Sequence, residues 1–404
     1  MSSALTKFVS TASLLFHANP DLYVSPHFVF CLMKTKKVST EVCDRFSSRS
    51  YLRQNIKNDC VSFMNKEWVP SSIEECTIFL DETNISEEES SSIISKWDQF
   101  LIYTNEYKKT YSHFEEMKNR FSLFHDNIQY ILQHNEGNHS YQLGVNQYAD
   151  WSNEEFKKYV MDGSLRGVLK TTCPKAKDMS GSYPSSVDWR SKGIVRSVPS
   201  DQGNCGSCYT FSTTASVEGA YAQKTGTFVK LSEQSLVDCG SGITYGSHGC
   251  SGGLMDGMFN YIHDKGIPSA DSYAYTAKEG TCHSYTPVTY VSGCEDVPAN
   301  ELQLTYALSQ RVVSIAIQAD GRSFQLYKSG VFDDATCYQG SLDHGVSLVG
   351  YGHDSSSNKD YYILMNSWGP SWGMNGFMNI KRNSVSSSTT GMCGLAMMNS
   401  YPLM

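Results

Sequence analysis

The feature that most constrains this sequence is a polar, glycine-rich loop that runs into a cysteine and then into a predicted helix. The loop covers residues 201–206, and Cys208 stands where the helix expected over residues 209–222 begins. A thiol at the first turn of a helix faces the positive end of the helix dipole, which favours the nucleophilic thiolate. Gly203 and Gly206 allow the tight backbone and accessible N–H groups that an oxyanion site requires. The stretch therefore predicts a reactive cysteine.

Residues 205–209 read C-G-S-C-Y, which resembles the active-site segment of papain-like cysteine proteases. In that family a His and an Asn follow the cysteine by roughly 130–150 residues. His344 follows Cys208 by 344 − 208 = 136 residues, and Asn366 follows it by 366 − 208 = 158 residues. Both lie in or beside apolar runs that predict strands, and the polar stretch 353–360 between them predicts a surface loop that absorbs extra residues.

The resemblance implies a role for each of these residues. Cys208 would be the nucleophile, and His344 would take its proton and later donate one to the leaving amine. Asn366 would orient the imidazole, as a third residue does in serine triads. Gln202 and the backbone N–H of Cys208 would bind the oxyanion. Tyr209 departs from the family pattern, in which Trp is commoner at this position.

The resemblance also implies a set of substrate contacts. Gly252 and Gly253 would pair with the backbone of an extended peptide. The pocket for the P2 side chain would be apolar and take Leu, Phe or Val rather than Arg, although Met255 and Met398 could equally be core residues. The residues assigned to substrate binding are Gly252, Gly253, Leu254, Met255, Ala316, Asp343, Trp368 and Met398.

Thirteen cysteines, eight of them after residue 182, suit an oxidising compartment better than the cytosol. The resemblance implies three disulfides, Cys205–Cys250, Cys239–Cys282 and Cys337–Cys393. Cys294 is then left over, and we expect a buried thiol, although an odd cysteine in a secreted chain can also pair between molecules.

An upstream helix carries a second resemblance. Six residues step by three or four positions along the helix expected over residues 114–135, and residues 144–150 follow as G-V-N-Q-Y-A-D. An ordinary amphipathic helix would explain the spacing alone, but the two patterns together resemble the E-R-F-N-I-N and G-N-F-D motifs of a cathepsin L-type inhibitory propeptide. Ser152 and Glu155 then predict a capping box. The six residues are Glu116, Arg120, Phe124, Asn127, Ile131 and Asn135.

These patterns predict an α+β, papain-like two-lobe fold with a helical lobe and a β-barrel-like lobe, preceded by a small helical prodomain. Residues 1–92 would be an extension with at most a weak signal peptide, ending in an acidic, serine-rich linker at 87–92. The prodomain would cover 93–160, a pro-segment linker through the cleft 161–181, and the peptidase domain 182–404. Activation cleavage is expected near residues 181–183.

Composition limits the partners. The net charge of −8 argues against nucleic acid, and no run is long and apolar enough to predict a membrane span. The cysteines of the N-terminal extension, Cys31, Cys43, Cys60 and Cys76, have no zinc-ligand pair spacing, so neither a metal nor another cofactor is expected. We expect a monomer that acts on polypeptides, is inhibited by its own prodomain, and follows the secretory pathway to a lysosome-like vacuole or the cell exterior.

Two other functions fit parts of the sequence. Cys205 and Cys208 form a C-x-x-C pair, which is typical of thiol–disulfide oxidoreductases. A protease-like binding protein with an inactive site is the second alternative. The joint presence of Gln202, Cys208, His344 and Asn366 favours an active cysteine endopeptidase over both.

Overall fold

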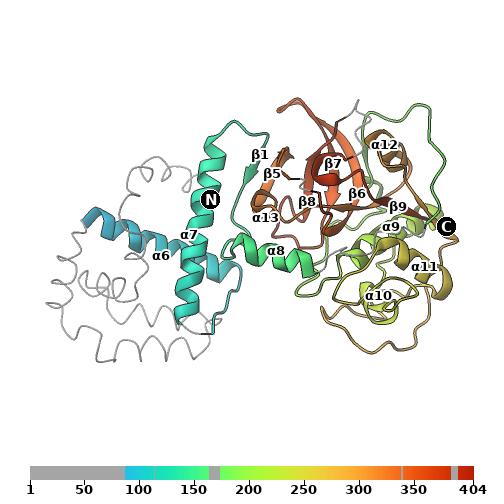
Figure 1. Cartoon of the computed structure of the whole chain (residues 1–404), viewed down its shortest axis with the longest axis horizontal. Coiled ribbons are helices and arrows are strands. Elements are labelled where there is room, and N and C mark those ends of the chain that lie inside the picture. The colour runs from blue at the N-terminus through green and yellow to red at the C-terminus, as the bar shows by residue number, and fades with distance from the viewer. Residues whose placement is uncertain (1–86, 113, 163–172, 338–339, 384–389) are drawn as a thin grey trace. The chain divides into compact units, whose positions relative to one another are not determined.

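The computed structural model describes residues 87–112, 114–162, 173–337, 340–383 and 390–404 (Figure 1). Residues 1–86 of the expected extension and 163–172 of the expected pro-segment lie outside the described residues. The chain divides into two compact units, residues 1–133 with 149–151, and residues 134–148 with 152–404.

The described residues of the first unit form α6 (Glu87–Glu106) and most of α7 (Phe114–Glu136). Their apolar faces meet in an aromatic core in which the rings of Trp97 and Phe121 stack with centroids 4.0 Å apart. The linker expected over residues 87–92 is wrong, because α6 begins at Glu87. Acidic residues at a helix start interact favourably with the helix dipole, so this stretch extends the helix instead of ending it.

Two polar residues of the propeptide-like motifs organise this unit. Asp150 accepts hydrogen bonds from the hydroxyls of Tyr103 and Tyr111 at 2.7 and 2.9 Å. Asn127, on α7, is buried and donates to the carbonyls of residues 149 and 151 at 2.9 and 2.8 Å. The motif spacing therefore has a direct physical role, since it ties the helix to residues 149–151.

The second unit contains an open sheet. Its strands lie in the order β1-β5-β8-β7-β6-β4-β9-β3, with β2 paired to β6. Among the described residues the sheet is not closed, so the expected barrel-like lobe is corrected to an open sheet whose end strands are β1 and β3. The strand bounds are β1 (Tyr141–Leu143), β2 (Val187–Asp188), β3 (Gly293–Asp296), β4 (Val313–Ile317), β5 (Tyr327–Phe332), β6 (His344–Asp354), β7 (Lys359–Met365), β8 (Phe377–Lys381) and β9 (Asn399–Leu403).

At each end of the sheet one strand, β5 or β3, pairs with residues that precede position 182. Strand β1 pairs with β5, and Tyr141 faces Gly330 in the register. On β3, Lys175 forms a parallel bridge with Asp296. An unpaired edge exposes backbone donors and acceptors. The sheet thus avoids open edges at these two positions by using segments assigned to the propeptide.

Three helices form the other lobe of this unit, and Figure 1 shows α10 and α11 on the side of α9 away from β7 and β8. Helix α9 is buried along most of its length, and serine hydroxyls join it to the sheet. Ser314 Oγ and Ser347 Oγ both donate to the carbonyl of Ser212, at 2.8 and 3.1 Å. The helices of this unit are α8 (Asn153–Asp162), α9 (Cys208–Thr225), α10 (Glu233–Cys239), α11 (Met255–Lys265), α12 (Glu301–Gln310) and α13 (Arg322–Gln325), with 3-10 turns at Arg190–Lys192 and Met392–Gly394.

Side-chain caps explain where several helices begin. The expected capping box is present, since Ser152 Oγ accepts from the backbone N–H of Glu155 and Glu155 accepts from that of Ser152. Ser232 caps α10 by accepting from the backbone N–H of Ser235 at 3.0 Å. The sequence also predicts a helix over residues 255–265, and α11 covers those residues. Helix α9 extends three residues beyond the expected end because Gly226 supplies a left-handed C-cap.

Four disulfides join described residues. Cys205 pairs with Cys250, Cys239 with Cys282, and Cys337 with Cys393. The expectation that Cys294 is a leftover thiol is wrong, because it pairs with Cys173. The two cysteines are 121 residues apart in the chain, and only the fold brings them together.

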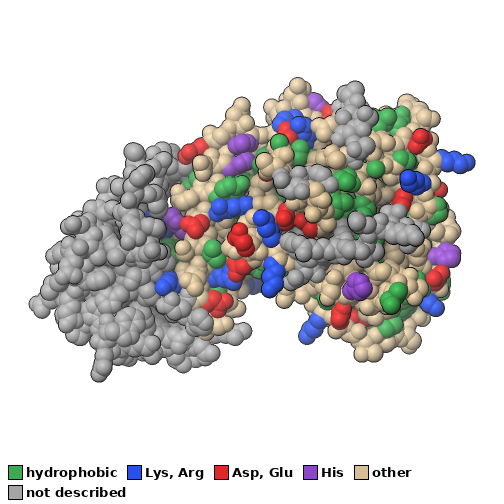
Figure 2. Space-filling view, in the orientation of Figure 1, with side chains coloured by type: hydrophobic (Ala, Val, Ile, Leu, Met, Phe, Trp, Pro, Cys, Tyr) green, Lys and Arg blue, Asp and Glu red, His purple; other side chains and the backbone are tan. Residues whose placement is uncertain are grey.

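Among the described helices, none has the length and apolarity that crossing a membrane would demand. On the face in Figure 2, the Lys and Arg side chains of the described residues are interspersed with Asp and Glu.

Candidate active site

Three secondary-structure elements bring the predicted catalytic residues together. Cys208 is the first residue of α9, His344 is the first residue of β6, and Asn366 directly follows β7. The Nε2 of His344 lies 2.8 Å from the Oδ1 of Asn366. The backbone N–H of Gly345 donates to the Sγ of Cys208 at 3.3 Å. The thiol and the imidazole therefore belong to one buried cluster.

The hydrogen bonds determine which ring nitrogen of His344 can act as a base. Asn366 Oδ1 also accepts from the backbone N–H of Ser367 at 2.8 Å, which identifies that atom as the amide oxygen. An amide oxygen cannot donate, so Nε2 of His344 carries the proton. The lone pair is then on Nδ1, the other nitrogen of the ring.

Burial controls the charge state of the pair. Cys208 is fully buried, and this desolvation raises the pKa of its thiol to about 11, although the N–H of Gly345 acts in the opposite direction. Burial lowers the pKa of His344 to about 4. The expected thiolate is therefore disfavoured in the full-length chain, because desolvation outweighs the backbone N–H groups of residues 208, 209 and 345, which lower the pKa. Near neutral pH the structure favours a thiol beside a neutral imidazole.

Trp368 forms an aromatic cover over the imidazole of His344. Its indole stacks on the imidazole with ring centroids 4.7 Å apart. Two rings from the segment before residue 160 lie against the same indole, Tyr148 at 5.8 Å and Phe156 at 5.3 Å. Gln147 Nε2 also donates to the carbonyl of Trp368 at 2.6 Å. Propeptide-like residues therefore pack directly on the aromatic cover of the site.

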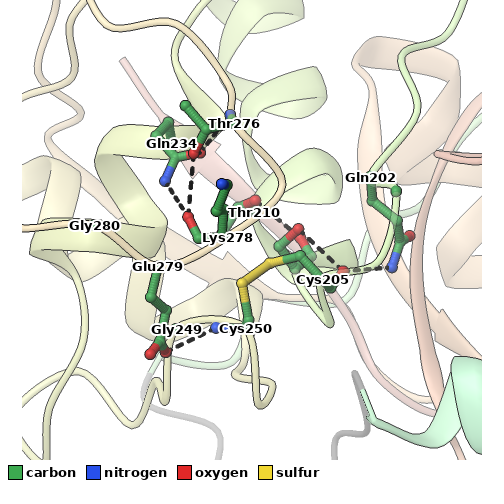
Figure 3. Close-up of a disulfide and its surroundings, with 12 residues drawn as sticks. Gln202, Cys205, Thr210, Gln234, Gly249, Cys250, Thr276, Lys278, Glu279 and Gly280 are labelled. Carbon is green, nitrogen blue, oxygen red and sulfur yellow. Dashed lines mark hydrogen bonds between the residues drawn. A yellow bond between two sulfur atoms is a disulfide. The ribbon is translucent and has the colours of Figure 1, made fainter.

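Gln202 lies in the loop before Cys208, and Figure 3 shows its amide directed at the carbonyl of Cys205. The Nε2–O distance is 3.1 Å, and the Oε1 accepts from Ser367 Oγ at 2.6 Å. The disulfide from Cys205 to Cys250 fixes the loop at the other end (Figure 3). Tyr159, on α8, donates its hydroxyl to the carbonyl of Gly203 at 2.8 Å.

Tyr209 connects Cys208 to the segment predicted to bind the substrate backbone. Its hydroxyl lies 2.7 Å from Ser247 Oγ and donates to the carbonyl of Gly249 at 2.9 Å. A Cβ at Gly253 would come within 2.8 Å of the Tyr209 ring, so only glycine fits there. Gly252 has a φ of +102°, which also favours glycine.

The residues predicted for the P2 pocket gather in one apolar cluster. Leu254 and Met255 lie at the start of α11, Ala316 is on β4, and Met398 packs against the same cluster. The backbone N–H of Ala316 donates to the carbonyl of Met398 at 3.0 Å. Asp343, also assigned to substrate, is buried and accepts from the backbone N–H of Ala319 at 2.7 Å, which is a structural contact within the sheet lobe.

Sequence reasoning missed two residues that position the site. Ser367 Oγ donates to the side-chain amide oxygen of Gln202. Its position directly after Asn366 in the sequence could have indicated it as a site residue. Tyr275 donates to the carbonyl of Gln202 at 2.7 Å, and its hydroxyl lies 2.6 Å from Ser207 Oγ. Tyr275 is 73 residues from Gln202 in the chain, and no motif in the sequence indicated it.

Comparison with known proteins gives two family matches. Residues 183–403 match the papain family of cysteine proteases, and residues 100–156 match the cathepsin propeptide inhibitor domain. The digestive procathepsin L 3 of Tenebrio molitor larval midgut has a solved structure that superposes with a TM-score of 0.70 at 40% identity, covering 76% of this chain and 99% of that one.

Two curated relatives extend the comparison. Cysteine proteinase RD21A of Arabidopsis thaliana is 42% identical over 295 residues, and cathepsin L1 of Drosophila melanogaster is 39% identical over 329. The alignments cover 71% and 77% of this chain. The chain spans 62% of the length of RD21A and 85% of the length of cathepsin L1.

Proposed function

Because the chain belongs to the papain family of cysteine proteases, we propose that it is a cysteine endopeptidase made as an inactive precursor. The observation that carries the proposal is the buried cluster in which His344 Nε2 binds Asn366 Oδ1 at 2.8 Å while Cys208 Sγ accepts from Gly345 at 3.3 Å. A nucleophile, a base and an orienting group are the parts that acyl transfer needs.

The chemistry follows from these positions. The proton of Cys208 passes to His344 Nδ1, and Sγ attacks the scissile carbonyl carbon. The oxyanion is bound by Gln202 Nε2 and the backbone N–H of Cys208. Collapse breaks the C–N bond, the amine leaves with the proton from His344, and a thioester remains. Water, deprotonated by His344, then hydrolyses the thioester and restores the thiol.

The precursor is held inactive in two ways. Tyr148, Phe156 and Tyr159 contact the aromatic cover and the Gln202 loop, which supports an inhibitory role for the segment before residue 160. Burial also favours the neutral thiol, which is a poor nucleophile. Removal of the propeptide would hydrate the site and reverse both effects.

Substrate preference and location are parts of the same proposal. The apolar cluster around Met255, Ala316 and Met398 supports Leu, Phe or Val at P2. Four disulfides support passage through the secretory pathway to a lysosome-like vacuole or the cell exterior. The alternative of a thiol–disulfide oxidoreductase loses its basis, because Cys205 pairs with Cys250 and not with Cys208.

Acidification of the purified full-length chain tests the proposal, with wild type beside Cys208→Ala. Intact mass and cleavage of a Phe-Arg reporter peptide are the readouts. With dithiothreitol present, we expect wild type alone to lose the residues before about position 182 and to gain activity. If trimming by another protease also yields no activity and no labelling of Cys208 by an epoxysuccinyl inhibitor, the active-peptidase proposal is wrong.

A further inference from the structure

The segment just before the expected cleavage point is joined to the peptidase domain by a disulfide. Cys173 pairs with Cys294 on β3, the end strand of the sheet. Beside it, the backbone N–H of Ala176 donates to the carbonyl of Asp296 at 2.8 Å, and that of Asp296 donates to the carbonyl of Pro174 at 2.9 Å. The segment thus adds a short strand to β3 next to a covalent bond.

The contacts continue toward residue 182. Gln303, on α12, binds both backbone groups of Met179, accepting from its N–H at 2.7 Å and donating to its carbonyl at 3.0 Å. Tyr306, one turn further along the helix, donates its hydroxyl to the carbonyl of Gly181. Side chains of α12 therefore recognise the backbone of this segment, which makes β3 and α12 a docking surface for an extended peptide.

We infer that Cys173–Cys294 is a covalent attachment site between the propeptide and the peptidase domain. A cut between Cys173 and Tyr183 then leaves the propeptide joined to the enzyme as a second chain. It separates only after the disulfide is reduced or after a second cut before Cys173. The consequence for activation rests on the proposed function, whereas the attachment itself rests only on the bond and the cleavage position.

Attachment changes what cleavage achieves. A linked propeptide binds the site as an intramolecular ligand, at an effective concentration on the order of millimolar for a short flexible link. Cleavage alone therefore leaves most molecules inhibited. Without the disulfide, the cleaved propeptide would instead diffuse away. The disulfide gives activation a second requirement, a reducing agent.

Release is a thiol–disulfide exchange with a dithiol. One thiolate of the dithiol attacks a sulfur of the Cys173–Cys294 bond and forms a mixed disulfide, and the sulfur that leaves takes up a proton. The second thiol of the dithiol then attacks the mixed disulfide, forming the oxidised dithiol and releasing the other cysteine. Two protons and two electrons pass from the dithiol to the two cysteines.

The surroundings make this exchange slow. The exposed fractions of Cys173 and Cys294 are 7% and 4%. The Sγ of Cys173 and carboxylate oxygens of Asp256 and Asp296 all lie within 4.8 Å of one another. These acidic groups oppose the approach of an anionic thiolate.

The Cys239–Cys282 bond offers a comparison, because Cys282 is exposed. We expect Cys239–Cys282 to be reduced at lower dithiothreitol concentrations.

The attachment is tested without any need for catalysis. The full-length Cys208→Ala chain is cut by a small amount of an unrelated protease, free thiols are alkylated, and intact mass is recorded before and after dithiothreitol. We expect the two fragments to remain one species until the reductant is added. Fragments that separate without reductant, or cutting that always falls before Cys173, would overturn the inference.

Two paired variants provide the controls. Cys173→Ser with Cys294→Ser should let the fragments separate without reductant. Cys239→Ser with Cys282→Ser removes a disulfide within one fragment and should leave them joined. If both variants behave alike, the bond to Cys173 is not the link. Since these experiments use an inactive Cys208→Ala background, their outcome does not depend on the proposed peptidase activity.

The effect on activation is measured with Cys208 intact. Wild type and the Cys173→Ser/Cys294→Ser variant, both purified without air so that Cys208 stays reduced, are acidified without added thiol. We expect the variant to reach full activity while wild type gains most of its activity only after dithiothreitol. Equal activity without thiol would overturn the regulatory role. No activity in either chain under any condition would instead count against the proposed function.

Discussion

The imidazole of His344 and the indole of Trp368 stack with centroids 4.7 Å apart and planes 22° from parallel. Trp368 is fully buried and in turn packs edge-on against Phe324 and Trp372. The ring of His344 is thus fixed by an aromatic face on one side and by Asn366 at its Nε2. Two independent restraints hold the base in one orientation.

Replacing Asn366 by Ala should lower kcat while changing KM little. The variant loses a buried hydrogen bond worth about 1–3 kcal/mol, which corresponds to roughly a tenfold to hundredfold fall in rate. Stacking on Trp368 should preserve part of the orientation, so activity should not vanish. Steady-state kinetics on the mature enzyme are the measurement. An unchanged kcat would show that Asn366 does not orient His344.

Replacing Tyr209 by Phe should raise KM for the reporter peptide more than it lowers kcat. The hydroxyl holds Ser247 and the carbonyl of Gly249, next to the glycines expected to pair with substrate. Loss of these buried bonds should lower the free energy of unfolding by about 1–3 kcal/mol. Kinetics and denaturant unfolding measure the two effects.

A matched control separates stability from substrate binding. Tyr261 also makes a hydroxyl contact, 2.7 Å from the hydroxyl of Tyr285, and lies on α11. Tyr261→Phe should destabilise the protein without altering KM. If Tyr209→Phe leaves KM unchanged as well, its hydroxyl serves only stability.

Replacing Arg196 by Met should destabilise the peptidase domain by about 3–5 kcal/mol, because two buried carboxylates lose their counter-charge. The guanidinium binds Glu218 and, at 2.8 Å, Glu233. Burial already raises the pKa of Glu218 to about 7 despite the arginine. Chemical unfolding at pH 7.5 and pH 5 measures the loss, which should be larger at the higher pH, where keeping the buried Glu218 carboxyl protonated costs more. Adding Glu218→Gln and Glu233→Gln should recover part of it.

Acid should weaken the first unit through His125, on α7. Burial lowers the pKa of this imidazole from 6.5 to about 4, with a further contribution from Lys96. The unfolded chain therefore binds the proton more readily, so the stabilisation is present above about pH 6.5 and is lost as the pH falls through 4. His125→Leu should shift half-maximal activation to lower pH.

The control for that shift is a histidine whose ring is exposed. His263 has a side-chain exposure of 53%, and His263→Gln should leave the activation pH unchanged. The readout is the appearance of activity across a pH series. The same pH of half-maximal activation in wild type and His125→Leu would contradict the role of His125.

Local chemistry made some features predictable from sequence and left others hidden. The capping box of Ser152 and Glu155 and the approximate ends of α9 and α11 follow from short-range patterns, which persist in any fold. The disulfide partner of Cys294 could not be predicted, because spacing along the chain does not determine which cysteines meet in space. The neutral state of Cys208 was not predicted either, because the burial that raises the pKa of its thiol depends on the fold and cannot be read from the sequence.

The pairing of β1 with β5 has a consequence for the finished enzyme. Gly330 adopts a φ of +84°, and a Cβ there would lie 2.4 Å from the carbonyl oxygen of Ser140. The shape of β5 is therefore matched to a neighbour that processing before residue 182 would remove. A mature peptidase would be one strand narrower than the sheet in which it first folded. The edge of β5 would then have unpaired backbone donors and acceptors, with which another extended chain could form hydrogen bonds.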